Sequence, residues 1–339
     1  MERLIESLRD DDPLPPSTVD IWQAVRAGRR RIRARWAGVG TVVLVVLAVV
    51  IPVLSQTATG GMPLEPANRP ASAPGFDPLR KVISVGEVPG TTPYSYGTAK
   101  YWQQYTLTIG TSGAAQAIVY APGWPATYLS GSVVQPETGT QAEPVAGRQA
   151  YWLNRTLDSD TGAMLAWEWT DGAWAFVQPQ GPEETQPDKE MMHRIASAVR
   201  VDGGTQLAMP FTVPVPAGHH LVGTTTMTRP HNDPYVRTGL LFDTEDLGDP
   251  GRFATTQRGF NVAVENGWKM GQKAGTNEQV DGHEARVVDG QVQIFDVADG
   301  FAIDVQGAAD KETLRAVARS VQLSKTPSDW STWVTQPLR

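Results

Sequence analysis

Residues 37–54, AGVGTVVLVVLAVVIPVL, form an uncharged run in which twelve of the 18 residues are Val, Leu or Ile. At about 1.5 Å per residue, a helix of this length spans about 27 Å, close to the thickness of the hydrocarbon core of a membrane. Such residues contribute roughly −0.3 to −0.6 kcal/mol each at the centre of a spanning helix, so together they supply at most about −4 to −7 kcal/mol. The run therefore predicts a single transmembrane helix.

The charges around this run predict its orientation. Residues 21–36 contain no acidic side chain, and the first charge after the run is Glu65. By the positive-inside rule, residues 1–36 are expected in the cytoplasm and residues 55–339 outside, in a single-pass protein of the cell membrane. The alternatives are a cleaved signal peptide, which usually has a shorter apolar run, and a buried core helix, which would not be flanked by arginines at one end. The expected topology residues precede the run directly: Arg29, Arg30, Arg31, Arg33, Arg35 and Trp36.

Composition narrows the function classes. The chain has 339 residues and a net charge of −7, and residues 55–339 hold 21 basic and 30 acidic side chains. A net charge of −9 over this region argues against nucleic acid as a partner. The chain has no cysteine, which excludes disulfides, thiolate metal sites and cysteine nucleophiles.

Two segments flank the apolar run. Residues 19–35 predict a short basic helix, which either lies on the bilayer surface or docks a cytoplasmic protein partner. Residues 55–78 hold five prolines and three glycines and predict an extended stalk.

The region after the stalk contains an internal repeat. The sequence DKEMMHRIASAVRV at 188–201 matches DKETLRAVARSVQL at 310–323, and each copy places apolar residues at the spacing of an amphipathic helix. Before each helix, an Asp-Gly pair separates two alternating runs, which predicts a hairpin. We therefore expect an α+β fold of two modules, 79–203 and 204–325. Each module is expected to be an antiparallel sheet with its C-terminal helix packed on it. A tail at 326–339 is expected to contact the second module through Trp330 and Trp333.

The N-terminal pattern LRDDDPLPPSTVDIWQAVRAGRRR, followed by one apolar span, resembles bacterial single-pass membrane proteins that are often encoded beside extracytoplasmic-function sigma factors. The ending of each module is similar to the small α+β domains in the extracytoplasmic parts of anti-sigma regulators. The resemblance implies a sensor-like role linked to sigma-factor regulation. One difference is that residues 1–36 are shorter than the usual cytoplasmic anti-sigma domain and lack its Cys-containing zinc motif.

The sequence holds no strong enzyme motif, and we expect a protein that is not an enzyme and needs no cofactor. Tyr96 and Lys100 have the spacing of a short-chain dehydrogenase dyad but follow no glycine-rich βαβ unit. A metal site could use His219, His220, His231 and Asp233, which lie within 15 residues, but no helical spacing holds them together, and we expect none.

The outer region is rich in tryptophan. Trp167 and Trp169 alternate with Glu168 and so share one face of a strand, and Trp174 follows across the turn. They either form a core face under the first helix or line a groove for an envelope ligand. The sequence thus favours a membrane-anchored, non-enzymatic binding or sensor-like domain; the alternatives are a tethered envelope hydrolase and a carrier of an apolar ligand.

Overall fold

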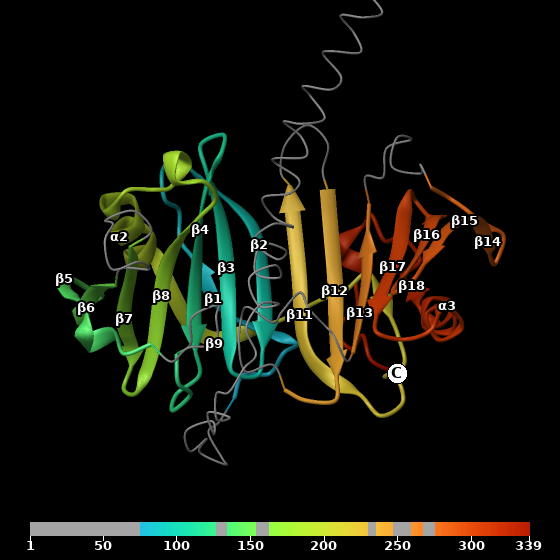
Figure 1. Cartoon of the computed structure of the whole chain (residues 1–339), viewed down its shortest axis with the longest axis horizontal. Coiled ribbons are helices and arrows are strands. Elements are labelled where there is room, and N and C mark those ends of the chain that lie inside the picture. Colours follow the sequence, from blue (N-terminus) through green and yellow to red (C-terminus); the bar gives the residue numbers. More distant parts are fainter. Residues whose placement is uncertain (1–74, 127–133, 154–162, 230–234, 247–258, 267–274) are drawn as a thin grey trace, which may run out of the picture. The chain divides into compact units, whose positions relative to one another are not determined.

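A computed structural model describes residues 75–126, 134–153, 163–229, 235–246, 259–266 and 275–339. Fourteen strands of this part form one continuous antiparallel sheet (Figure 1). In order across the sheet they are β14 (Glu278–Val280), β15 (His283–Val288), β16 (Gln291–Ala298), β17 (Phe301–Gly307), β13 (Phe260–Glu265), β12 (Tyr235–Asp243), β11 (His220–Arg229), β2 (Thr91–Ala99), β3 (Trp102–Ile109), β4 (Gly113–Tyr120), β8 (Ala173–Gln180), β7 (Met164–Thr170), β6 (Arg148–Leu153) and β5 (Thr140–Val145).

The strand order repeats about the centre of the sheet. From β2 outward to β5 and from β11 outward to β14, the two halves have the same topology. Two smaller pairs also correspond: β1 (Arg80–Val85) with β9 (Val199–Gln206), and β10 (Phe211–Thr212) with β18 (Gln322–Leu323). The central strands pair antiparallel, with Gly97 opposite Thr225, so an approximate twofold axis passes through the sheet at this pair.

The two Asp-Gly hairpins lie where the sequence predicted them. Thr170 pairs with Ala173 across Asp171-Gly172, and Ala298 pairs with Phe301 across Asp299-Gly300. The glycines have φ angles of 69° and 75°, in the left-handed region that glycine adopts without steric cost. Local turn chemistry was therefore sufficient to locate both hairpins.

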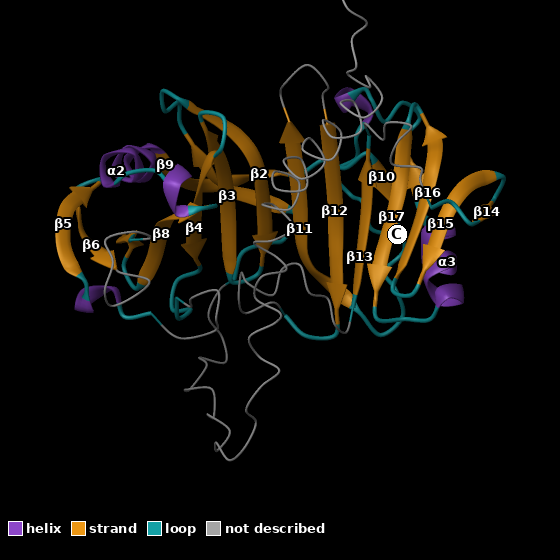
Figure 2. Cartoon of the chain, turned by 45° about the horizontal axis from the view of Figure 1, so that its top comes forward, coloured by secondary structure: helices purple, strands orange, loops and turns teal. Residues whose placement is uncertain are grey.

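Both predicted amphipathic helices are present, as α2 (Lys189–Ala198) and α3 (Lys311–Ser320). Each begins after an aspartate N-cap: Asp188 accepts a hydrogen bond from Met191 N and Asp310 from Thr313 N, both at 2.8 Å. The helices pack on one face of the sheet, α2 on β7 and β8 and α3 on β16 and β17 (Figure 2). Their buried apolar residues are Met192, Ile195 and Ala196 in α2, and Leu314 and Ala318 in α3.

Three apolar cores hold the layers together. One lies between α2 and its half of the sheet, and another between α3 and the other half. The third lies on the opposite face, which carries neither described helix and which we call the helix-free face; it includes Trp102, Tyr120 and Phe176. Fully burying a large apolar side chain stabilises a fold by about 1.5–3 kcal/mol, so these contacts fix the helices directly on the sheet.

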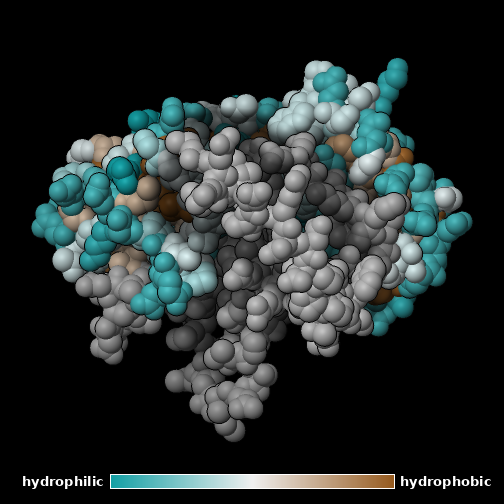
Figure 3. Space-filling model, turned by 90° about the horizontal axis from the view of Figure 1, so that it is seen from above, coloured by the Kyte–Doolittle hydropathy of each residue, from teal (hydrophilic) through white to brown (hydrophobic). Residues whose placement is uncertain are grey.

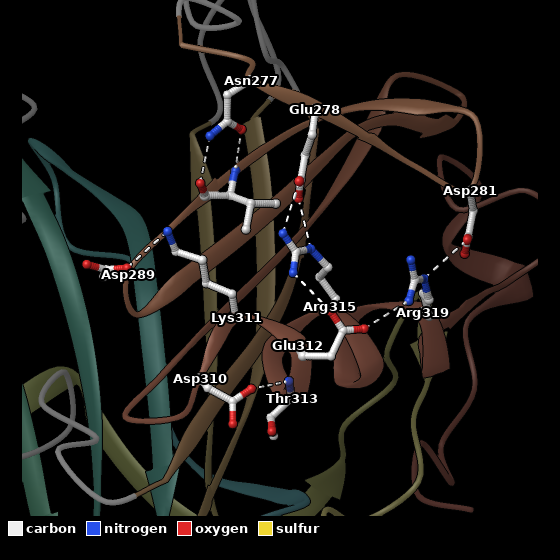
Figure 4. Close-up of polar contacts among 11 residues, drawn as sticks. Asn277, Glu278, Asp281, Asp289, Asp310, Lys311, Glu312, Thr313, Arg315 and Arg319 are labelled. Atoms are coloured by element: carbon white, nitrogen blue, oxygen red, sulfur yellow. Dashed lines mark hydrogen bonds and ion pairs between the residues drawn. The ribbon is translucent and has the colours of Figure 1, made fainter.

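Charged residues clamp α3 to the edge of the sheet (Figure 4). Arg315 forms a two-pronged ion pair with Glu278 of β14, at 2.9 and 3.0 Å, and Arg319 lies 3.3 Å from Asp281. In the first half, the equivalent contact joins His193 of α2 to the carbonyl of Glu143 in β5 at 3.3 Å. Hydrophilic residues gather over both ends of the sheet in the described part of the surface (Figure 3), which suits edge strands that must resist further pairing.

The structure corrects the expected fold class. The described part of the chain is mostly β rather than α+β, because strands make up most of it and its α-helices are α2 and α3 alone. The two expected sheets are one, joined by the pairing of β11 with β2. The module boundary at 203/204 stays a prediction, and the tail returns to the second half through bridges from Val334 to Met209 and from Leu338 to Val213.

The structure also corrects the expected membrane topology. Among the described residues, no helix has both the length and the apolar character that a membrane crossing requires. This finding contradicts the predicted single-pass localisation. Residues 37–54, the arginines before them and Trp36 lie outside the described residues.

Candidate functional site

A polar patch separates the two apolar cores beneath the helices, next to the approximate twofold axis. Along one row of the sheet, cross-strand neighbours are Tyr105, Tyr96, Thr226 and Thr238. Tyr105, Thr226 and Thr238 are 8%, 5% and 0% exposed. The hydroxyl of Thr238 has no hydrogen-bond partner among the described residues, which is costly for a buried polar group.

Strand β1 places Lys81 over this patch. Gln103 of the main sheet accepts a hydrogen bond from Val82 N at 2.8 Å and donates one to the carbonyl of Arg80 at 2.7 Å. These bonds hold β1 across the sheet on both sides of Lys81. Its Nζ then lies 4.8 Å from the ring centre of Tyr96 and 4.7 Å from that of Tyr105. We call Lys81, Tyr96, Tyr105, Thr226 and Thr238 the junction site.

Burial shifts the ionisation of all three titratable groups in the junction site. It lowers the pKa of Lys81, and the negative charge of Asp202 opposes this shift only in part. Burial raises the pKa of Tyr96, although the nearby hydroxyl of Thr226 opposes this shift, and burial also raises the pKa of Tyr105. At neutral pH the site therefore combines two protonated phenols with an amine that loses its proton more readily than an ordinary lysine. Perturbed groups of this kind cluster at functional sites.

The second half of the molecule serves as an internal comparison. Strand register and the shared pattern LRKVISVGEVPG and LAMPFTVPVPAG place Met209 at the position equivalent to Lys81. By the same register, Thr224 is equivalent to Tyr96 and Leu240 to Tyr105. The fold can therefore be built with other residues at these positions, and the lysine and the tyrosines are specific to the first half.

A second polar cluster lies on the helix-free face of the second half. Arg237 on β12 is 3.0 Å from Glu265 Oε1 and 2.9 Å from Asp304 Oδ2. Asp304 also accepts a hydrogen bond from the guanidinium, whereas no donor is aligned with Glu265 Oε1, so the contact of that oxygen with Arg237 is an ion pair alone. The side chains of Glu265 and Asp304 are 3% and 2% exposed. We call these three residues the charged trio.

Neutral donors complete the hydrogen bonding of the charged trio. Tyr235 donates to Glu265 at 2.6 Å, and Gln291 and Gln306 donate to the two oxygens of Asp304 at 2.8 and 2.9 Å. Burial opposes the charge of Arg237, but Asp304 and Glu265 outweigh it and raise the pKa of the guanidinium above its usual value. In the first half the equivalent positions hold three aromatic residues, Trp102, Tyr120 and Phe176.

The histidines predicted as weak metal candidates are not brought together. His220 lies 3.1 Å from Asp246, which also pairs with Lys100 at 2.6 Å, whereas His219 packs against the ring of Phe260. Within the described ranges, no group of three or more His, Cys, Asp or Glu side chains is placed to hold a metal ion. The other two candidates, His231 and Asp233, lie outside those ranges.

The three tryptophans of the predicted groove lie on two different faces. Trp167 is 3% exposed in the core under α2, and Trp169 packs against the same core while its indole donates to the carbonyl of Tyr120 at 3.0 Å. Trp174 pairs with Glu168 across the hairpin and therefore lies on the helix-free face, beside Tyr151. The ligand groove itself stays a prediction.

Sequence reasoning did not find the junction site or the charged trio. The sequence nevertheless indicated both sites, because each has a charged residue at a position where the other copy of the repeat has an apolar one. Lys81 aligns with Met209. Asp304 interrupts the run FAIDVQ, which aligns with AWAFVQ of the first copy and places Asp304 opposite Phe176. Comparing the two copies position by position would have located both sites.

Known proteins add no further guide to the site. No family model matches the chain, and neither does any curated protein.

Proposed function

We propose that this chain is a non-enzymatic binding protein and that the junction site receives its ligand. The observation that carries the proposal is the position of the Lys81 nitrogen over the rings of Tyr96 and Tyr105, at the boundary of two apolar cores. An apolar surround with a few converging polar groups is the usual composition of a small-molecule site.

The groups in the junction site suggest the ligand class. The Lys81 nitrogen favours a carboxylate or carbonyl oxygen, and the buried hydroxyl of Thr238 has unused hydrogen-bonding capacity. The faces of the two tyrosine rings suit a flat or apolar portion of the ligand. A small molecule that carries a carboxylate or carbonyl on an apolar body would satisfy all three features.

The two alternative functions find less support. A hydrolase needs an activated nucleophile or a free base, but the carboxylates of the charged trio accept hydrogen bonds from neutral donors and face one guanidinium. A carrier of an apolar ligand needs a hollow beneath a helix, yet Met192 and Ile195 of α2 pack on the sheet at 1% and 0% exposure. A protein partner for residues 19–35 and a link to sigma-factor regulation stay predictions.

Thermal unfolding of the full chain with benzoate tests the proposal. Benzoate has a carboxylate and a flat apolar ring, and a ligand at a hundred times its Kd stabilises the folded state by about 2.7 kcal/mol. We expect benzoate to raise the Tm of the wild-type protein, and benzyl alcohol, which lacks the charge, to raise it less.

Two variants make this test specific. Lys81→Met introduces the residue that the second half uses at the same position, and Lys311→Met removes a lysine that is 46% exposed and paired with Asp289. We expect the benzoate shift to persist in Lys311→Met and to disappear in Lys81→Met. An equal shift in both variants would refute the proposal, because benzoate would then bind elsewhere.

A further inference from the structure

We infer that Lys81 is a reactive amine that condenses reversibly with the carbonyl group of an aldehyde ligand bound in the junction site. This inference rests on the proposed function and extends it from simple binding to a covalent attachment. It concerns Lys81 because its surroundings differ from those of Lys100 and Lys311, which are held in ion pairs.

The geometry leaves the Lys81 nitrogen without a carboxylate in ion-pair contact among the described residues; Asp202 acts on it only at longer range. By contrast, Lys100 is held by Asp246 at 2.6 Å and Lys311 by Asp289 at 3.1 Å. An ion pair keeps an ammonium group charged, and a charged ammonium has no lone pair with which to attack a carbonyl. Lys81 is half-buried, so the residue is partly withdrawn from water.

The rings of Tyr96 and Tyr105 contribute to the burial of Lys81; their faces also attract the charged ammonium, and burial opposes that attraction. Both lie within 4.8 Å of the Lys81 nitrogen, and Tyr105 is 8% exposed. Burial lowers the pKa of Lys81 and so increases the fraction of neutral amine, whereas hydrogen bonding with Asp246 contributes most to raising the pKa of Lys100. A desolvated lysine in an apolar pocket is one of the established ways in which proteins activate an amine.

The chemical step balances without an oxidant or reductant. The lone pair of neutral Lys81 forms a bond to the carbonyl carbon, and the carbonyl π electrons move to oxygen, which takes up one of the two amine protons by way of water. The resulting carbinolamine loses the proton from nitrogen and the hydroxyl as water, which leaves a C=N bond. Addition of water reverses the step and releases the aldehyde.

The experiment treats the full chain with 4-formylbenzoate, which adds an aldehyde to the benzoate probe. Cyanoborohydride supplies a hydride that converts any imine to a stable secondary amine, and mass spectrometry of proteolytic peptides locates the adduct. We expect the adduct at Lys81 to form faster than at Lys189, Lys311 or Lys325, to be lost in Lys81→Met, and to be suppressed by excess benzoate.

The comparison among lysines within the wild-type protein keeps the test decisive even if Lys81→Met folds poorly. Adducts that form at equal rates on Lys81, Lys189 and Lys311 would overturn the inference, because they would reflect ordinary surface amines. A thermal shift with benzoate but no adduct at Lys81 would overturn the covalent step and leave the proposed binding function standing. Absence of both the shift and the adduct would overturn both.

Discussion

Removal of Arg237 is expected to destabilise the protein strongly, because this guanidinium is the only cation in the charged trio. Arg237→Met leaves the carboxylates of Glu265 and Asp304 without their shared cation. Both side chains are buried, at 3% and 2% exposure, so water cannot replace the guanidinium. Breaking a buried ion pair by removing one partner costs about 3–5 kcal/mol. For a domain of this size each kcal/mol corresponds to about 2–4 °C, so the Tm should fall by about 6–20 °C.

Asp304→Asn provides the matched variant, because it removes one carboxylate and leaves Arg237 and Glu265 as a balanced pair. The amide keeps an acceptor oxygen for a neighbouring glutamine, so the loss should be closer to that of one charge-assisted hydrogen bond, about 1.5–3 kcal/mol. Urea unfolding of the full-length variants, followed by tryptophan fluorescence and circular dichroism, measures both. If Asp304→Asn lost as much unfolding free energy as Arg237→Met, or more, the balance of charges inferred for the charged trio would be wrong.

Three further outcomes test other parts of the structure. Leu314→Ala should cost about 2–5 kcal/mol in urea unfolding, because Leu314 is fully buried under α3, and an unchanged midpoint would contradict that packing. Gly172→Ala should cost about 1–2 kcal/mol in the same assay, since φ is 69° in the hairpin turn; no loss would mean that the turn adopts another conformation. Burial disfavours the charged form of Asp246, but hydrogen bonds from Lys100 and His220 outweigh it and lower its pKa below 3.8. The pair therefore stabilises the fold above that value and loses this contribution as the pH falls through the lower, folded-state pKa, so Tm measured from about pH 5 to about pH 3 should fall less steeply in Lys100→Met than in wild type.

The features predicted correctly from the sequence are those with local signals. The helices of residues 189–198 and 311–320 follow an aspartate cap and carry an apolar stripe, and each hairpin is marked by its Asp-Gly turn. These signals act over fewer than ten residues, where propensity and turn chemistry decide the structure. The repeat then indicated that each element would occur twice.

The joining of the two halves has no local signal. The pairing of β2 with β11 brings Gly97 opposite Thr225, more than a hundred residues away in the sequence, and both strands carry many polar residues. Hydrophobic alternation is weak there, because Thr98 and Thr224 are buried and bond to each other at 2.6 Å. Separate sheets were therefore predicted, and the residues of the junction site were not expected to lie together.

The pairing of β2 with β11 also has a consequence for how such a chain can arise. In a single copy of the repeat, the strand equivalent to β2 or β11 would be an unpaired edge of the sheet. Two identical copies would pair these edges across the same axis and form a homodimer. In a homodimer, any lysine introduced beside the axis must occur on both sides. Fusion into one polypeptide removes that constraint, so one copy can acquire an amine and two phenols while its counterpart acquires a buried guanidinium and two carboxylates. The covalent link between the copies is what permits the asymmetry on which a specific site at the centre depends.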